Sequence, residues 1–251
     1  MLVPVGLLGR RHSIPGRDLL PIALLGVGQF GILVLLLNWS LETITAGRAA
    51  LLFATMPLMT MALAVTLRRE PFAGTRLAGV IAAVGGVALA LGEEILPATG
   101  SGAASLSWGG HGAALGSAFV GAVCSVAYRP YLERNPTLPV STVAMVAAVA
   151  FLFIPALGEE PAGSLPAMGL GEWATVLFIG LSSAAGYVCW LWALGHADAT
   201  RVTVFLALSP VTAVLLETVV LGEPITVGVS AGIGLVGFGL WLANRPEIDA
   251  L

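Results

Sequence analysis

Few side chains of this sequence could take part in chemistry, and most of those that could lie within long apolar segments. The candidates for contact with a small organic molecule are Gln29, Asn38, Ser183, Tyr187 and Trp190. Polar groups inside such segments usually face a protein interior, and aromatic rings hold organic molecules by stacking. Gln29 lies mid-segment and cannot reach water, so it is the strongest single candidate. Aromatic residues near segment ends more often form an interfacial belt, but Tyr187 and Trp190 lie deeper than that.

Glu217 is the only acidic residue predicted to lie within the interior of an apolar segment. A carboxyl group at such a place could bind and release a proton, and so couple another process to a proton gradient. Glu217 also lies about four residues from one end of its segment, so its side chain could extend to the membrane surface instead. The surface position is the simpler interpretation.

Pro57 and Pro210 lie in the middle of two apolar segments. Each proline removes one backbone hydrogen bond from a helix and favours a kink. Paired kinks could act as gates on the two sides of a central cavity. Alternatively, these prolines are simply tolerated, as prolines often are in membrane helices.

The sequence contains no cluster of residues suited to metal binding or catalysis. Cys124 and Cys189 offer neither a disulfide framework nor a metal site, and His196 with Asp198 supplies too few ligands. The phosphate-binding string GxxxxGK[ST] and the zinc string HExxH do not occur. We therefore predict no catalytic residue, no metal and no cofactor, and we do not expect an enzyme.

The composition is that of an integral membrane protein. Hydrophobic residues make up 57% of the 251 residues and charged residues only 10%, and the mean hydropathy is +0.96. Soluble domains contain about a quarter charged residues, so this chain could not cover a water-exposed surface. The net charge of −3, without basic clusters, argues against a nucleic-acid partner. The expected partner is the lipid bilayer.

Eight apolar runs are long enough to cross a bilayer, and in lipid such runs must be helices. They cover 18–40, 46–67, 76–92, 108–128, 139–157, 172–193, 199–221 and 226–243. The longest connection, 93–107, is predicted to be an external linker between a first part, 1–92, and a second part, 108–243. Residues 244–251 are predicted to form a cytoplasmic tail.

The arginine residues predict the orientation of these segments, because positive charges favour the cytoplasmic side. When the loop 9–17 is placed in the cytoplasm and the sides alternate, only Arg48 falls outside. The arginines that fall inside are Arg10, Arg11, Arg17, Arg68, Arg69, Arg76, Arg129, Arg134, Arg201 and Arg245. The C-terminus is therefore predicted to be cytoplasmic.

The sequence contains an internal repeat. The segment LETITAGRAALLFATMPLMTMALAVTLRREPFAGTRLAG from Leu41 aligns without gaps with LGHADATRVTVFLALSPVTAVLLETVVLGEPITVGVSAG from Leu194, an offset of 194 − 41 = 153. The aligned pairs include Arg48 with Arg201, Pro57 with Pro210, Glu70 with Glu223, Gly79 with Gly232, and Gly86 with Gly239. The two copies have opposite predicted orientations, so the repeats are inverted. Inverted helical repeats are typical of secondary transporters.

Rows of small residues predict close packing between helices. They are Gly109, Ala113, Ser117, Gly121 and Ser125 in one segment, Ala78, Ala82, Gly86 and Ala90 in another, and the pair Gly228 and Gly232. Tight packing within one chain is the main interpretation. A sliding surface or a homodimer contact is the alternative.

Both copies carry A-x-R near a helix start, a central Pro, and then L-x-x-x-E-P before a Gly-rich helix. This pattern resembles the EamA repeat of the drug/metabolite transporter superfamily. The second copy is the closer match, because it contains Leu-Gly-Glu-Pro at 221–224 where the first has Arg68 and Arg69 before Glu70. The resemblance implies an all-α polytopic membrane bundle of two inverted repeats with five helices each. About eight full spans are present here, so the first repeat is expected to lack one to two N-terminal helices.

The resemblance also implies a multi-pass secondary transporter of the bacterial cytoplasmic membrane. Such a protein moves small organic solutes, which are amino acids, metabolites or drug-like molecules, by alternating access. The energy would come from a proton gradient or from the gradient of the solute. Two other interpretations are a truncated remnant that does not transport and an intramembrane enzyme.

Overall fold

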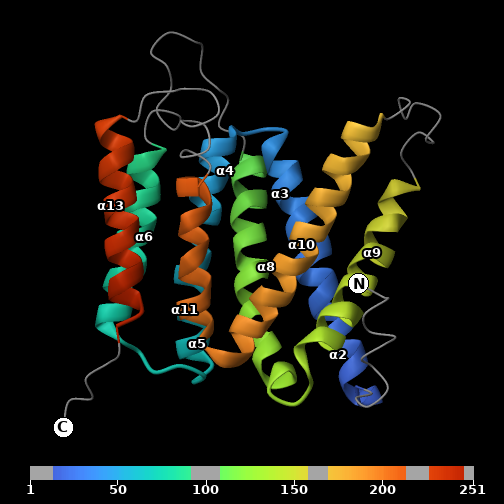
Figure 1. Ribbon diagram of the computed structural model, residues 1–251. Helices are drawn as coiled ribbons and strands as arrows, with labels where there is room; N and C mark the ends of the chain where they lie inside the picture. The colour runs from blue at the N-terminus through green and yellow to red at the C-terminus, as the bar shows by residue number, and fades with distance from the viewer. Residues whose placement is uncertain (1–13, 92–107, 158–168, 213–225, 246–251) are drawn as a thin grey trace. The chain divides into compact units, whose positions relative to one another are not determined.

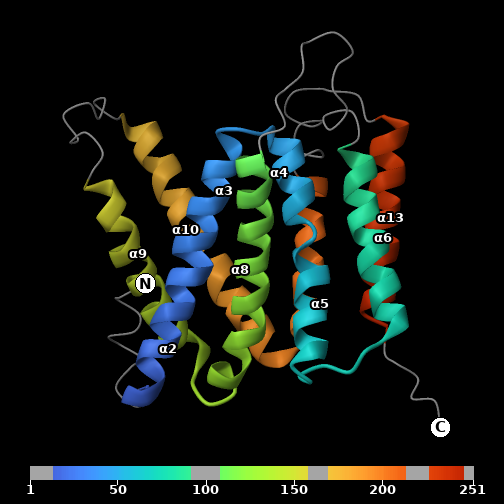
Figure 2. The same ribbon diagram turned by 180° about the vertical axis from the view of Figure 1, so that it is seen from behind.

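The computed structural model describes residues 14–91, 108–157, 169–212 and 226–245, and within these ranges it contains helices and connections but no strand (Figures 1 and 2). The elements are α2 (Gly16–Gly26), the π-helix η2 (Val27–Ile32), α3 (Leu33–Leu41), α4 (Ala46–Phe53), α5 (Met56–Thr66), α6 (Gly74–Ala90), α8 (Trp108–Leu132), α9 (Thr137–Ala156), α10 (Leu170–His196), α11 (Ala199–Thr203), the 3-10 helix η4 (Val204–Ala207) and α13 (Val227–Ala243).

Five continuous helical stretches are long and apolar enough to cross a membrane: Gly16–Leu41, Ala46–Thr66, Trp108–Leu132, Thr137–Pro155 and Leu170–His196. Three shorter apolar helices cover Gly74–Ala90, Ala199–Thr212 and Val227–Ala243. Each of the predicted apolar segments overlaps one of these stretches, and residues 213–221 of the predicted segment 199–221 lie outside the described residues. The prediction of an all-α polytopic membrane protein is therefore confirmed.

The chain forms two compact units, which we describe separately. Unit 1 combines residues 1–32 with 127–197, and in it α2 packs closely against α9. A Cβ atom added at Gly26 would overlap the backbone of Ala144, and one added at Gly31 would lie 2.6 Å from the ring of Phe151. The side-chain amide of Asn135 donates a hydrogen bond of 3.1 Å to Asp18, so the start of α2 is also tied to the turn before α9.

Unit 2 combines residues 33–126 with 198–251, and its main contact is between α6 and α13. A Cβ atom added at Gly86 would lie 2.7 Å from the carbonyl oxygen of Gly232, and one added at Gly239 would lie 2.6 Å from that of Gly79. The nearest atoms are backbone atoms, which cannot turn away as a side chain can. The two helices can approach this closely only because these positions are glycine. Of the small residues predicted to pack tightly, Gly86 and Gly232 do so within the chain, whereas Ala78, Gly109 and Gly228 are exposed.

The same contact shows how the two copies of the repeat are related. Gly79 and Gly86 of the first copy correspond to Gly232 and Gly239 of the second. Across the contact, however, Gly79 meets Gly239 and Gly86 meets Gly232. A two-fold axis between the helices produces this exchange, so the equivalent helices run in opposite directions. The two repeats are therefore inverted, as the sequence predicts.

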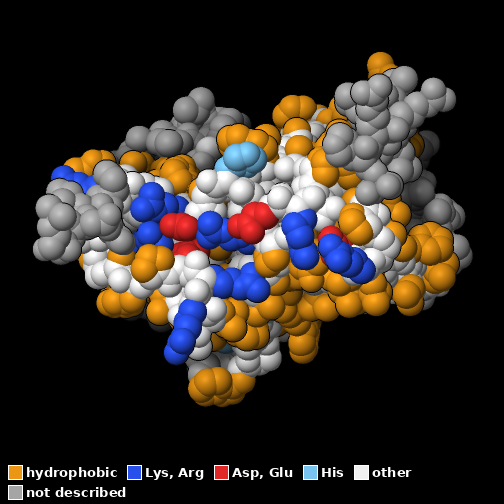
Figure 3. Space-filling model, turned by 90° about the horizontal axis from the view of Figure 1, so that it is seen from below, with side chains coloured by type: hydrophobic (Ala, Val, Ile, Leu, Met, Phe, Trp, Pro, Cys, Tyr) orange, Lys and Arg blue, Asp and Glu red, His pale blue; other side chains and the backbone are white. Residues whose placement is uncertain are grey.

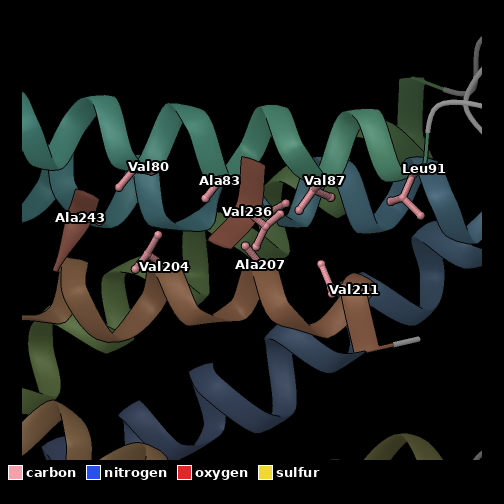
Figure 4. Packing of buried hydrophobic residues seen from close by; sticks show 10 residues of the cluster. Val80, Ala83, Val87, Leu91, Val204, Ala207, Val211, Val236 and Ala243 are labelled. Carbon is pink, nitrogen blue, oxygen red and sulfur yellow. The ribbon is translucent and has the colours of Figure 1, made fainter. Parts of the chain in front are cut away.

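Apolar side chains beside this contact fill the core of unit 2 (Figure 4). The buried members of this core are Ala54, Val80, Ala83, Val87, Leu91, Val204, Ala207, Val211, Val236 and Ala243. Ala54 and Ala207 are equivalent positions of the two copies, since 54 + 153 = 207. The equivalent positions Ala54 and Ala207 of the two copies therefore both pack in the core with residues of α6 and α13.

Charged side chains gather where connections join the helices (Figure 3). In unit 1 they include Arg17, Asp18, Arg129, Glu133 and Arg134, and in unit 2 Arg68, Arg69, Glu70, Arg76, Asp198 and Arg201. All of these arginines are among those that the sequence places on the cytoplasmic side. The orientation of the C-terminus in a membrane stays a prediction.

Arg68 ends α5 in a conformation that favours glycine. Its φ is 54°, and the backbone amides of Arg69 and Glu70 both donate to the carbonyl oxygen of Ala64, at 2.8 and 3.2 Å. A side chain in this left-handed conformation costs about 1 kcal/mol. We expect Arg68→Gly to raise the unfolding temperature in detergent by a few degrees, roughly what 1 kcal/mol gives in a chain of this size. Arg68→Ala removes the charge but keeps the strain, so an equal rise in both variants would contradict this explanation.

Candidate functional site

The helix that contains Pro57 is interrupted just before the proline. α4 ends at Phe53, α5 begins at Met56, and Pro57 lies in the first turn of α5. The hydroxyl of Thr55, in the interruption, donates a hydrogen bond of 2.6 Å to the carbonyl oxygen of Leu52. A proline is tolerated in a first turn because the amide that it lacks would have no partner there.

The second copy is interrupted at the equivalent place. The α11 helix gives way to the 3-10 helix Val204–Ala207, and α-helix resumes at Leu208, two residues before Pro210. The irregular segments of both copies contain a residue of the buried core, Ala54 in one and Ala207 in the other. Interrupted helices at corresponding positions of inverted repeats are the usual framework of a substrate site in a transporter.

Buried hydroxyl groups lie in the helices next to these interruptions. Thr60 donates to the carbonyl oxygen of Met56 at 2.9 Å, and Thr203 donates to that of Thr200 at 3.2 Å. Thr200 is also fully buried, and its own hydroxyl oxygen has no hydrogen-bond partner. Polar hydroxyl groups are therefore buried near both interruptions, among mostly apolar side chains.

A buried group of charges links the two copies at one end of unit 2. We call it the ion-pair cluster, and it consists of Glu70, Arg76, Asp198 and Arg201. Arg76 Nη1 lies 3.1 Å from Glu70 Oε2, and Arg76 Nη2 lies 3.3 Å from Asp198 Oδ2. Arg201 Nε lies 3.6 Å from the same oxygen of Asp198. The side chains of Glu70 and Arg76 are only 2% and 4% exposed, so water hardly screens their attraction.

Glu70 also makes a direct contact with the second copy. Its Oε1 accepts a hydrogen bond of 3.2 Å from the backbone amide of Thr200, in the first turn of α11. Asp198 is at the N-cap position of the same helix, but its side chain makes no capping hydrogen bond, and its carboxylate pairs with Arg76 and Arg201. The equivalent Thr45 does cap its helix, because its hydroxyl accepts a hydrogen bond from the amide of Arg48 at 3.4 Å.

Unit 1 contains a buried aromatic group around Tyr187. The hydroxyls of Tyr187 and Tyr128 lie 2.9 Å apart and share a hydrogen bond. The ring of Phe30 meets that of Tyr187 edge to face, with 4.2 Å between the ring centres. Phe30 and Gln29 both belong to the π-helix η2, and π-helical turns are frequently found at functional sites.

In the described part of unit 1, two polar atoms are buried without a hydrogen-bond partner. They are Oε1 of Gln29 and Nε1 of Trp190. A buried donor or acceptor without a partner is costly, so native proteins rarely keep one without a reason. The Gln29 oxygen can accept a hydrogen bond and the Trp190 nitrogen can donate one.

The remaining predicted site residues lie elsewhere. Asn38 and Ser183 are both exposed on the surface of their helices. Glu217 falls outside the described residues. Ser230 lies in the string GVSAG at 228–232, which fits the GxSxG motif of serine hydrolases, but it sits inside α13, where its hydroxyl donates to Thr226 at 3.1 Å. No group of three potential metal ligands occurs in the ranges that the structure describes.

Sequence reasoning missed Phe30, Tyr128 and the ion-pair cluster. The partners in both groups are far apart in the chain, since Tyr128 and Tyr187 are separated by 59 residues and Glu70 and Thr200 by 130. One available signal was the glycine-rich run of Gly26, Gly28 and Gly31 around Phe30. Another was the charged Arg76 at the start of an apolar helix.

Comparison with known proteins agrees with this architecture. A protein of Streptantibioticus cattleyicolor described as a "Probable terminal-alkyne amino-acid exporter" is 32% identical over 251 residues, which cover 99% of this chain and 80% of that protein. An uncharacterized transporter of Archaeoglobus fulgidus is 27% identical over 243 residues, which cover 96% and 82%. A crystal structure with a TM-score of 0.74 and 23% identity, covering 89% of this chain and 75% of that one, has a similar fold.

The EamA-like transporter family matches residues 1–92 and 108–245, which is nearly the whole chain. The inverted copies, their paired interruptions and these relatives agree with one another. The chain belongs to the EamA-like transporter family and is a multi-pass membrane transporter.

Proposed function

We propose that this chain is a secondary transporter that moves small organic solutes of the amino-acid class across the bacterial cytoplasmic membrane by alternating access. The observation that carries the proposal is the pair of helix interruptions before Pro57 and Pro210. Because the two copies are inverted, a bend at one interruption opens toward one side of the membrane and a bend at the other opens toward the opposite side.

The solute class rests on two lines of support. A relative at 32% identity is described as a probable exporter of a terminal-alkyne amino acid. In unit 1, the unpartnered Nε1 of Trp190 could donate to a carboxylate, and Oε1 of Gln29 could accept from an ammonium group. The rings of Phe30 and Tyr187 supply apolar surface for a side chain. Coupling to protons through Glu217 belongs to the same proposal.

The protein reconstituted in liposomes should take up radiolabelled apolar and aromatic amino acids, and unlabelled solute should compete. Empty liposomes are the control, and the panel should include organic cations and sugars as other solute classes. An imposed pH gradient across the same liposomes tests proton coupling. If no solute of any class enters faster than into empty liposomes, the proposal fails.

Trp190 offers a sharper test of the site. Trp190→Phe keeps an aromatic ring but removes the N–H group. Losing a hydrogen bond to a charged group costs about 1.5–3 kcal/mol, so we expect the KM for uptake to rise by roughly ten- to a hundredfold. Trp192→Phe is the matched control, since Trp192 is 56% exposed and stacks on His196. Equal KM values for the two variants would remove Trp190 from the site.

A further inference from the structure

The ion-pair cluster holds together parts of unit 2 that belong to different copies of the repeat. Glu70 follows α5 and Arg76 lies in the first turn of α6, both in the first copy, whereas Asp198 and Arg201 lie at the start of α11 in the second. The start of α11 cannot move away from the turn between α5 and α6 unless these contacts break. The interrupted helix of the second copy is therefore anchored at this end.

The positions of the other copy that correspond to the ion-pair cluster carry a partly different set of residues. The offset of 153 pairs Glu70 with Glu223 and Arg201 with Arg48, so these two are shared by both copies. Arg76, however, corresponds to Val229, since 76 + 153 = 229, and Asp198 corresponds to Thr45, since 45 + 153 = 198. Valine and threonine cannot form an ion pair. The bond between Arg76 and Asp198 therefore has no counterpart in the other copy.

We propose that Arg76 and Asp198 form a one-sided latch, which holds this end of the transporter closed and so sets its resting orientation. The inference rests on the alternating access proposed above. In a symmetric pair of inverted repeats, the states open to either side would be nearly equal in energy, and a contact made in only one state shifts the population toward that state. Because Val229 and Thr45 stand at the equivalent positions, this buried ion pair is one contact that differs between the copies.

The burial of the pair supports a role in switching. Arg76 is 4% exposed and bonds two carboxylates, so opening this end means separating charges that have little access to water. A buried ion pair adds little stability compared with an apolar pair of similar size, and specifying one structural state is its best-attested use. Asp198 is 27% exposed, so the latch lies at the edge of the buried region, where water can enter once it opens.

The residues at the equivalent positions of the other copy, Val229 and Thr45, indicate which substitutions to use in a test. The variant Arg76→Val with Asp198→Thr gives this end the residues of the other copy, and it removes both charges together. Two reporter cysteines at equivalent buried positions, Ala49→Cys and Val202→Cys, are introduced separately after Cys124→Ala and Cys189→Ala. The rate of labelling by a water-soluble maleimide is then measured in nanodiscs, where both sides are accessible.

In the variant Arg76→Val with Asp198→Thr, we expect the maleimide to react with the Val202→Cys reporter about tenfold faster than it does when Arg76 and Asp198 are present. The Ala49→Cys reporter should react more slowly. The opposite changes are expected when Thr45→Asp and Val229→Arg build the pair in the other copy. If both reporters label faster, the pair merely stabilises the fold, and the proposal is wrong. Unchanged labelling in both designs also overturns it.

The measurement separates this inference from the proposed function. Transport by the native chain with unchanged reporter labelling would reject the latch alone. If the labelling rates of the two reporters change in opposite directions but no solute is transported, the proposed function is rejected. The exchange between states open to either side would then still be supported. Gel filtration of each variant shows whether it is folded, and the design in the other copy decides the question if Arg76→Val with Asp198→Thr aggregates.

Discussion

Gly232→Ala should destabilise the chain by about 2 kcal/mol, even though alanine is the better helix former. The added Cβ atom would lie 2.6 Å from the carbonyl oxygen of Gly86 and 2.7 Å from the amide nitrogen of Ala90. Neither backbone atom can move without a shift of α6, so the helices must separate along their contact. Overpacking of this kind costs about 3 kcal/mol, from which the gain of about 1 kcal/mol in helix propensity is subtracted.

The same helix provides the control for this prediction. A Cβ atom added at Gly234 would meet nothing within 4 Å, so Gly234→Ala gains helix propensity without a clash. Both variants would be purified in detergent and unfolded with increasing amounts of sodium dodecyl sulfate, with tryptophan fluorescence as the signal. Gly232→Ala should unfold at a lower concentration than the native chain and Gly234→Ala at an equal or higher one. Equal midpoints for the two variants would mean that α6 and α13 are not in this close contact.

Glu70→Ala is expected to have a larger effect, a loss of about 3–5 kcal/mol. Removal of this carboxylate leaves the buried guanidinium of Arg76 without its 3.1 Å partner and the amide of Thr200 without its acceptor. Asp198 still neutralises part of the charge, but it is bonded to a different nitrogen.

An exposed pair of the same chemistry shows whether burial is the cause. Arg129 Nε and Glu133 Oε1 lie 3.2 Å apart, nearly the same distance, but their side chains are 33% and 57% exposed. Glu133→Ala should therefore cost less than about 1 kcal/mol. Unfolding in detergent under identical conditions measures both variants. Similar losses for Glu70→Ala and Glu133→Ala would show that Glu70 is far more accessible to water than its burial indicates.

The architecture could be predicted from the sequence because the strongest signals were local. Apolar runs of membrane length locate the helices within a few residues, and the gapless repeat with its arginine distribution predicts the inversion. Boundaries were less accurate where polar residues continue a helix. For example, α8 extends to Leu132 past Arg129, because its last turn can emerge from the apolar layer without ending.

The site was harder to predict because it depends on which face of each helix is covered. Ser183 and Tyr187 are one turn apart on α10, but only Tyr187 is buried, because partners cover this helix mainly toward its C-terminal end. Glu70 and Arg76 resemble ordinary residues of a water-exposed turn when read in sequence. They form a buried pair only because α11, whose Thr200 is 130 residues from Glu70 in the sequence, packs against them in the fold.

The glycine contacts between α6 and α13 also limit which substitutions each copy of the repeat can accept. Gly79 touches Gly239 and Gly86 touches Gly232, so each contact joins glycines of different copies, and a larger residue in either copy disrupts a surface that both copies share. Elsewhere the duplicated segments are free to diverge, as Arg76 and Val229 have done. At the contact between α6 and α13, a substitution in one copy changes the packing of the other copy as well.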